Sequence, residues 1–199
     1  MCLIIYSPDG KIPRRHRAEG LLANPDGWGF MAVEGGQIVI QKGMAPAEFW
    51  RAWPQRPPGP VVFHSRTGTH GVQDTSNCHP FLLHGGRLAV AHNGVIARCG
   101  TDRVRSDTRV FVEEILEGLP RNFLRRKAIV ALIAGYIGHS KLVFIDDTGT
   151  VRIVNEGLGH WRKGSWYSNS SYLPPKPAII SAPGQLGRPL IWHRNTYGS

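Results

Sequence analysis

Three pairs of short apolar runs, each joined by a few turn residues, limit the possible folds of this chain most strongly. Residues 28–33 and 37–41 meet at EGG, and residues 80–84 and 87–92 meet at Gly85 and Gly86. The third pair lies in KLVFIDDTGTVRIVNE, which turns at DDTG. Turns this short join antiparallel strands, because a parallel pair needs a crossover of a dozen or more residues. The pattern predicts antiparallel hairpins and disfavours an alternating parallel α/β fold.

Four further segments are predicted to be helices that cover these sheets. Residues 14–23 form one, residues 47–53 follow Pro46 at a first helical turn, and Ser106 is a suitable N-cap for residues 107–119. Residues 121–136 are expected to continue as a second consecutive helix. Residues 2–7, 61–66 and 164–170 read as additional strands. The first two predicted helices are separated by strands, and the last two follow each other directly. Helices that do not alternate regularly with strands predict the α+β class.

Length and composition predict one domain. At 199 residues and 22.0 kDa, the chain has room for one substantial core, so we expect a single domain over residues 1–199. A Pro-rich tail from about residue 173 is expected to wrap the surface. No apolar stretch approaches the roughly 20 residues that cross a bilayer, and the first apolar run has no basic leader. These features predict a cytoplasmic protein with no membrane partner.

The formal net charge of +10 favours anionic partners. Basic residues cluster at 14–17, 103–105 and 125–127. A nucleic-acid-related partner would fit this surface, and a solvated basic surface that only maintains solubility fits it equally well.

Thiols and histidines are the candidate reactive groups. Cys2, Cys78 and Cys99 form no CxxC pair, and they are too few for a disulfide framework. Five residues close in sequence are candidate metal ligands: His64, His70, Cys78, His79 and His92. Their spacing matches no compact zinc motif, so we expect no metal and no cofactor.

Cys2 is the best candidate nucleophile. If Met1 is removed, the α-amino group of Cys2 lies within reach of its own thiol. An α-amine titrates near ~7.7 to 8.0 and a thiol near ~8.5, so the amine can accept the thiol proton near neutral pH. Position alone equally allows Cys2 to be a packed small hydrophobe, which is the reading preferred for Cys78 and Cys99.

Several motifs together resemble the class II glutamine amidotransferases. Cys2 is followed by HSRTGTHG at 64–71, NCHPF at 77–81, HNG at 92–94 and SDT at 106–108. NPDGWGF, LVFIDDTGTVRI and WYSNSSY resemble the smaller, stand-alone members, and the likeness covers about residues 2–172. The resemblance implies the N-terminal-nucleophile hydrolase fold, a four-layer αββα sandwich of two mainly antiparallel sheets.

The resemblance also implies a role for each matching residue. Cys2 would attack the side-chain amide carbon of glutamine, releasing ammonia and forming a γ-glutamyl thioester. Asn93 and Gly94 would form the oxyanion hole. Arg66 would bind the α-carboxylate of glutamine, and Asp107 the α-ammonium. Thr69 and His70 would line the carboxylate pocket.

Each of these residues has another explanation when taken singly. Asp107 could be a first-turn acid that favours the helix dipole, and Arg66 an exposed salt-bridge residue. Asn93 and Gly94 could be a simple hairpin turn. Two positions depart from the larger family members: Thr67 replaces a tryptophan, and Arg109 replaces a glutamate and adds a positive charge near the pocket rim.

Three functions therefore stay open. In the first, the chain hydrolyses glutamine and supplies ammonia to a separate synthetase or transferase. In the second, it hydrolyses another γ-glutamyl or amide compound. In the third, it is a catalytically silent nucleic-acid-binding or regulatory module.

Overall fold

A computed structural model describes residues 2–69, 71–100 and 103–174. Its larger sheet has six strands in the order β3-β2-β4-β1-β10-β9, and every neighbouring pair is antiparallel. The strands are β1 (Leu3–Ser7), β2 (Trp28–Glu34), β3 (Gln37–Gly43), β4 (Val61–Ser65), β9 (His160–Arg162) and β10 (Ser165–Tyr167). The first strand of the chain therefore lies inside the sheet, between β4 and β10.

The smaller sheet has four strands in the order β5-β6-β7-β8, also antiparallel throughout. They are β5 (Phe81–Leu83), β6 (Leu88–Asn93), β7 (Lys141–Asp146) and β8 (Val151–Val154). All three hairpins predicted from the short turns are present, because the turn residues and the alternating runs both act locally.

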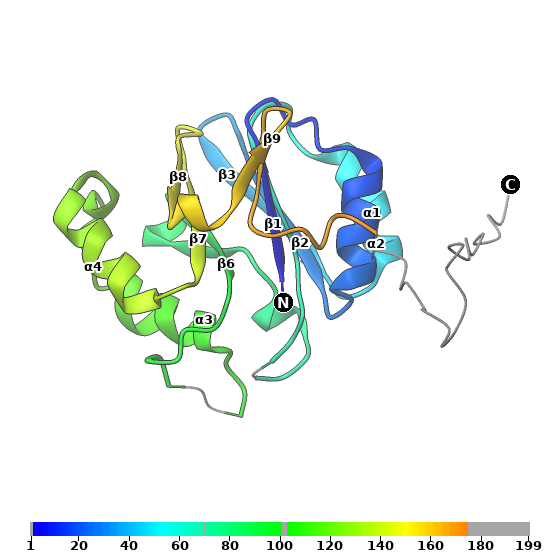
Figure 1. Cartoon of the computed structure of the whole chain (residues 1–199). Helices are drawn as coiled ribbons and strands as arrows, with labels where there is room; N and C mark the ends of the chain where they lie inside the picture. The colour runs from blue at the N-terminus through cyan, green and yellow to red at the C-terminus, as the bar shows by residue number, and fades with distance from the viewer. Residues whose placement is uncertain (1, 70, 101–102, 175–199) are drawn as a thin grey trace, which may run out of the picture.

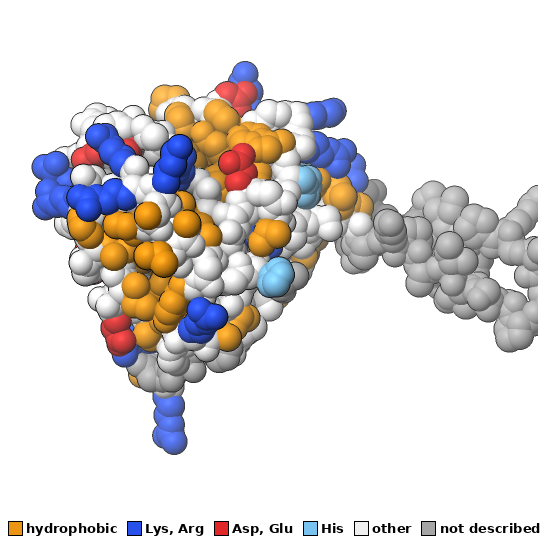
Figure 2. Space-filling view, turned by 60° about the vertical axis from the view of Figure 1, so that its left-hand side comes forward, with side chains coloured by type: hydrophobic (Ala, Val, Ile, Leu, Met, Phe, Trp, Pro, Cys, Tyr) orange, Lys and Arg blue, Asp and Glu red, His pale blue; other side chains and the backbone are white. Residues whose placement is uncertain are grey.

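Helices cover the outer face of each sheet (Figure 1). The six-stranded sheet packs against α1 (Arg14–Ala23) and α2 (Pro46–Ala52), and the four-stranded sheet against α3 (Asp107–Phe111) and α4 (Lys127–Ile137). Figure 2, turned to bring the α4 side forward, shows apolar side chains between groups of Lys and Arg. The predicted α+β class and the four-layer αββα sandwich are confirmed.

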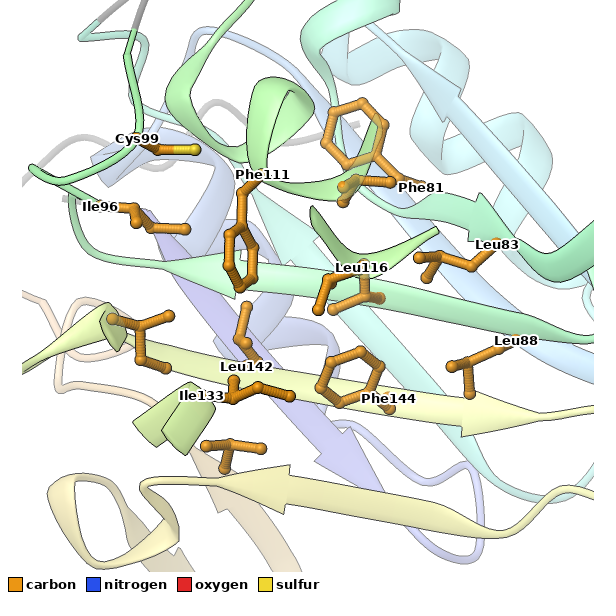
Figure 3. Close-up of a cluster of buried hydrophobic side chains, with 14 of the residues drawn as sticks. Phe81, Leu83, Leu88, Ile96, Cys99, Phe111, Leu116, Ile133, Leu142 and Phe144 are labelled. Atoms are coloured by element: carbon orange, nitrogen blue, oxygen red, sulfur yellow. The ribbon is translucent and has the colours of Figure 1, made fainter. Parts of the chain in front are cut away.

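Three apolar clusters hold the layers together. One joins α1 and α2 to the six-stranded sheet, and a second joins α3 and α4 to the four-stranded sheet (Figure 3). The third lies between the sheets: Ile4, Met31, Val62, Ala89, Ala91, Val143, Ile145 and Trp166. Because side chains alternate along a strand, each sheet contributes one set of residues to the helices and the other set to this central layer.

The helices after residue 106 differ from the prediction. Residues 107–119 are α-helical only to Phe111, and residues 112–116 form a π-helical turn that rotates the buried face, so that Val112 and Leu116 are buried. Residues 121–136 are not one helix: a 3₁₀ turn (Phe123–Arg125) precedes α4, with Arg126 extended between them. The glycines in these segments, Gly118 and Gly135, lie several residues after the breaks at 112 and 126, so no glycine or proline marks either break.

One turn and one strand also differ from the prediction. Leu83 pairs with Leu88, so the turn between β5 and β6 spans residues 84–87, and His84 adopts a positive φ of 52°. The short strand β9 was not predicted, because its three residues are all exposed and show no alternation.

The predicted tail falls mainly outside the described residues, which end at 174. Among the described residues, no helix is long and apolar enough to cross a membrane.

Candidate functional site

Strand alternation directs three of the predicted site residues into the space between the sheets. The central apolar cluster takes alternate residues from β1, β4 and β6. Cys2, Arg66 and Asn93 continue these alternations at the strand ends. The hydrogen bond from the Asn93 side chain to the Cys2 carbonyl agrees with this placement, and the Arg66 guanidinium donates to the Asp26 carbonyl at 3.4 Å.

Cys2 is held at both its thiol and its carbonyl. Its Sγ lies 3.3 Å from the Thr67 backbone nitrogen, which donates to it, and 3.5 Å from the Thr67 carbonyl oxygen. Its carbonyl oxygen accepts from the side-chain amides of Asn93 and Asn169, the latter at 2.7 Å. Residues from both sheets therefore meet at Cys2.

The strand that follows Cys2 is fixed on both edges. Leu3 pairs with Ser65 of β4. On the other edge, Ile4 donates its N–H to Ser168 Oγ at 2.8 Å and accepts from the Ser168 N–H at 3.0 Å. A strand paired on both sides has little freedom, so the position of Cys2 is set by the backbone of its neighbours.

Burial raises the pKa of the Cys2 thiol, and the Thr67 N–H and the positive charge of Arg66 oppose this shift. The thiol is therefore protonated near neutral pH. It needs a base before it can act as a nucleophile.

Arg66 is buried, with 3% of its surface exposed, so the explanation as an exposed salt-bridge residue is wrong. Its N–H donates to the Gly27 carbonyl at 2.7 Å, and its carbonyl accepts from the Asp26 N–H at 2.9 Å. These two hydrogen bonds hold the backbone of Arg66, just after β4, against the NPDG loop at 24–27.

Asn93 and Gly94 are not a hairpin turn, because Asn93 pairs with Lys141 and residues 94–140 intervene. Gly94 has a φ of +137°, and a Cβ there would collide with Ser140 Oγ. Both the dihedral angle and the space therefore require glycine at this position.

Asp107 joins α3 to the loop after β6. Its carboxylate accepts the Ile96 N–H at 2.7 Å and the Thr108 N–H at 2.7 Å. Ser106 caps the helix by accepting the Arg109 N–H at 3.2 Å, as predicted. The buried carboxylate of Asp107 thus lies beside the loop that contains Gly94.

A cluster of three buried histidines connects the sheets next to the site. His64 Nε2 lies 3.1 Å from the His92 carbonyl oxygen and 2.8 Å from His79 Nδ1. Since a carbonyl only accepts, His64 carries its hydrogen on Nε2. His92 Nδ1 reaches Thr108 Oγ1 at 2.7 Å, and so supports the residue beside Asp107.

These histidines are neutral at physiological pH. Burial lowers the pKa of His64 to about 3 and that of His92 to about 4, and it lowers the pKa of His79 well below its ordinary value. Among the described residues, no group of three or more His, Cys, Asp and Glu side chains could hold a metal ion.

The remaining predicted residues are less closely placed. Thr69 is exposed in the loop after β4, and His70 lies outside the described residues. Thr67 donates its hydroxyl to Asn24 Oδ1 at 2.9 Å. Arg109, which was expected to add a positive charge near the pocket rim, is paired with Glu113: its Nε lies 2.7 Å from Glu113 Oε1.

Asn169, Asn24 and Asp26 were missed as site residues. Asn169 holds the Cys2 carbonyl, Asn24 binds the Thr67 hydroxyl, and Asp26 accepts the Gly68 N–H at 2.9 Å. The motifs NPDGWGF and WYSNSSY contain all three. Only the pairing of β1 with β4 and β10 shows that these motifs surround Cys2.

Known proteins resemble this chain in sequence and in fold. No family model matches the chain. The chain is 31% identical over 114 residues to glutamine–fructose-6-phosphate aminotransferase (isomerizing) of Agrobacterium fabrum, a match that covers 50% of this chain and 18% of that protein. It is 29% identical over 94 residues to the protein of the same name from Lactiplantibacillus plantarum, covering 42% and 16% respectively.

The fold is similar to that of glutamine phosphoribosylpyrophosphate amidotransferase from B. subtilis, with a TM-score of 0.51 and 15% identity. That likeness covers 84% of this chain and 41% of the other. The matches span less than a fifth of the curated relatives. The resemblance to class II glutamine amidotransferases and the N-terminal-nucleophile hydrolase fold are confirmed.

Proposed function

We propose that this chain, which shares the fold of the class II glutamine amidotransferase domain, hydrolyses the side-chain amide of glutamine with Cys2 as the nucleophile. One observation supports this most strongly. The Cys2 thiol contacts the backbone next to Arg66, and the Cys2 carbonyl contacts the side chain of Asn93. A nucleophile, a carboxylate-binding cation and an amide donor thus come together from three strands.

The reaction begins with removal of Met1, which frees the α-amino group of Cys2. This amine accepts the thiol proton, and the thiolate attacks the amide carbon of glutamine. The tetrahedral intermediate breaks its C–N bond, the leaving nitrogen takes the proton from the α-ammonium, and ammonia departs. Water then cleaves the γ-glutamyl thioester, giving glutamate and restoring the thiol.

Asn93 and Gly94 stabilise the oxyanion of each tetrahedral intermediate. The side-chain amide of Asn93 has two N–H groups, of which one is directed to the Cys2 carbonyl. The other N–H and the backbone N–H of Gly94 are the donors that we assign to the substrate oxygen. Because these donors are already fixed by the fold, little reorganisation is needed as charge develops.

Arg66 and Asp107 recognise the two charged groups of the substrate. The planar guanidinium of Arg66 suits a bidentate contact with the α-carboxylate. The carboxylate of Asp107 binds the α-ammonium, and Thr69 and His70 line the carboxylate pocket. Burial of both Arg66 and Asp107 strengthens these interactions, since less water competes for them.

A separate synthetase or transferase receives the ammonia in this proposal. The curated relatives are aminotransferases that extend far beyond the matched region. A nucleic-acid partner gains no support from the comparisons.

One observation favours a second substrate class, another γ-glutamyl compound. Thr67 is smaller than the tryptophan of larger relatives, and its hydroxyl is directed to Asn24. A side chain smaller than tryptophan at this position would suit a substrate with a larger, substituted amide.

Glutamate release from glutamine tests the proposal, with intact mass reporting whether Met1 is present. We expect release by the protein lacking Met1, none by Cys2→Ala, and unchanged release by Cys99→Ala, a cysteine in the core beneath α3 and α4. Release that survives Cys2→Ala would contradict the proposal. If a thioester could be trapped only from other γ-glutamyl amides, the substrate in the proposal would be the second class and not glutamine.

A further inference from the structure

Helix α4 is apolar on its outer side as well as on its inner side. Ile133 and Ile137 are buried against the four-stranded sheet. On the opposite side Leu132 is 73% exposed, and Ala128, Ala131 and Gly135 are exposed beside it. A helix that is apolar all round is normally buried, so this outer side is suited to a partner.

The border of this surface is strongly basic. Residues 118–145 contain no Asp or Glu and five Lys or Arg: Arg121, Arg125, Arg126, Lys127 and Lys141. Arg98, from the loop after β6, is exposed on the same side. Within the described residues, none of these side chains takes part in an ion pair. Figure 2 shows apolar side chains bordered by Lys and Arg on this face.

A cavity of about 390 Å³ adjoins the helix. One wall is the loop of residues 94–98, and the other is residues 135–141 at the end of α4. The Tyr136 hydroxyl donates to the Arg98 carbonyl at 3.1 Å and ties the two walls together. Val95, which is 48% exposed, extends the apolar surface to the cavity.

We propose that the outer side of α4 and this cavity form a docking surface for an acidic protein partner that inserts an apolar side chain. Carboxylates of the partner would pair with the basic border, and its apolar anchor would cover Leu132 or enter the cavity. A desolvated apolar anchor surrounded by complementary charges is the usual anatomy of a protein interface.

Charge argues against the other occupants. A two-fold contact with a second copy would place the basic border of one molecule against that of the other. Nucleic acid would meet an apolar centre with no side-chain donors at Ala128, Ala131 and Leu132. This docking surface does not depend on the proposed hydrolysis of glutamine, although Gly94 lines the cavity and places a partner beside the proposed oxyanion hole.

The test uses a designed amphipathic peptide helix with glutamates along both borders of a leucine stripe, labelled for fluorescence anisotropy. We expect the peptide to bind the wild type, and to bind Leu132→Asp at least about tenfold more weakly. Leu22→Asp on α1 is the matched control, because Leu22 is 66% exposed on the opposite side of the molecule. It should bind like the wild type, and circular dichroism checks that both variants are folded.

The charge requirement is tested in the same assay. Arg125→Glu with Lys127→Glu should also weaken binding about tenfold, and added salt should weaken wild-type binding. A second peptide has lysines in place of the glutamates. The proposal would be overturned if the wild type bound both peptides equally well, or if Leu132→Asp bound the glutamate peptide as well as the wild type does. A wild-type dimer in light scattering that Leu132→Asp makes monomeric would assign the surface to a second copy instead. DNA binding lost in the charge variant and kept in Leu132→Asp would assign it to nucleic acid.

Discussion

The two sheets hold their parts of the site in different ways. On the six-stranded sheet, Cys2 and Arg66 are positioned mainly by the backbone, since β1 is paired on both edges and the chain at Arg66 is bonded to the NPDG loop. On the side of the four-stranded sheet, Asp107 at the start of α3 is positioned by its carboxylate, which accepts the Ile96 and Thr108 N–H groups. The nucleophile therefore depends on strand pairing, and the proposed ammonium site depends on a few polar contacts.

This difference predicts which changes affect chemistry and which affect substrate binding. Residues at the meeting point of the sheets should change kcat, and residues on the α3 side should change KM. The histidine cluster spans both sheets and should act on stability. The following predictions test this division.

Asn93→Ala should have the largest effect, because it removes a proposed oxyanion donor where the sheets meet. We expect kcat for glutamine to fall by about 10²- to 10³-fold, with a smaller change in KM. Steady-state measurement of glutamate release checks this. An unchanged kcat would remove Asn93 from the oxyanion hole.

Asp107→Asn should act on substrate binding. Hydrogen bonds to charged groups contribute about 1.5 to 3 kcal/mol, so KM should rise by roughly 10- to 100-fold while kcat changes much less. Asp146→Asn is the matched control, because Asp146 also accepts backbone N–H groups, from Thr148 and Thr150, in an exposed turn. A fall confined to kcat would count against the assigned role.

The histidine cluster should make stability depend on pH. The pKa of His64 is lowered to about 3 and that of His92 to about 4 in the folded protein, while unfolded histidine titrates near ~6.5. Between these values the unfolded chain binds more protons, so the free energy of unfolding is highest above pH ~6.5 and falls as the pH is lowered toward 4.

Replacing one member of the cluster should reduce that slope. His79→Gln should flatten it by up to about 1.4 kcal/mol per pH unit between pH ~6.5 and ~4, measured by urea unfolding. His139→Gln, at an exposed position after α4, should leave the slope unchanged. Identical slopes in His79→Gln and the wild type would show that burial does not lower the pKa of His79.

Asn169→Ala should have the smallest effect on the reaction. It removes one of the two side-chain donors to the Cys2 carbonyl, and a neutral hydrogen bond contributes about 1 kcal/mol. We expect kcat to fall by about fivefold, since β1 stays paired on both edges. A loss as large as that of Asn93→Ala would mean that side chains, and not strand pairing, position the nucleophile.

Local patterns in the sequence predicted most of the fold. The three hairpins follow from turn residues between alternating runs, and α1 has the predicted bounds. The break before α4 was missed because Arg126 adopts an extended conformation that no local residue requires. The strand β9 was missed because it is short, exposed and paired only with β10.

The candidate site was predictable where a motif indicated a function. The motifs identified Cys2, Arg66, Asn93 and Asp107 as candidates, but not how they are held. Asn169 is 167 residues from Cys2 in the sequence and reaches it only through the pairing of β10 with β1. Long-range pairing of this kind leaves no local signal.

The most direct test of the central claim compares two forms of this protein that differ only in what precedes Cys2. One is the protein after treatment with methionine aminopeptidase, and the other keeps Met1 because a bulky residue inserted between Met1 and Cys2 blocks removal. Intact mass confirms each form, and glutamate release from glutamine is measured in both. We predict release only by the form whose N-terminal residue is Cys2. Equal release by both forms would contradict the proposal that the α-amine of Cys2 is the base.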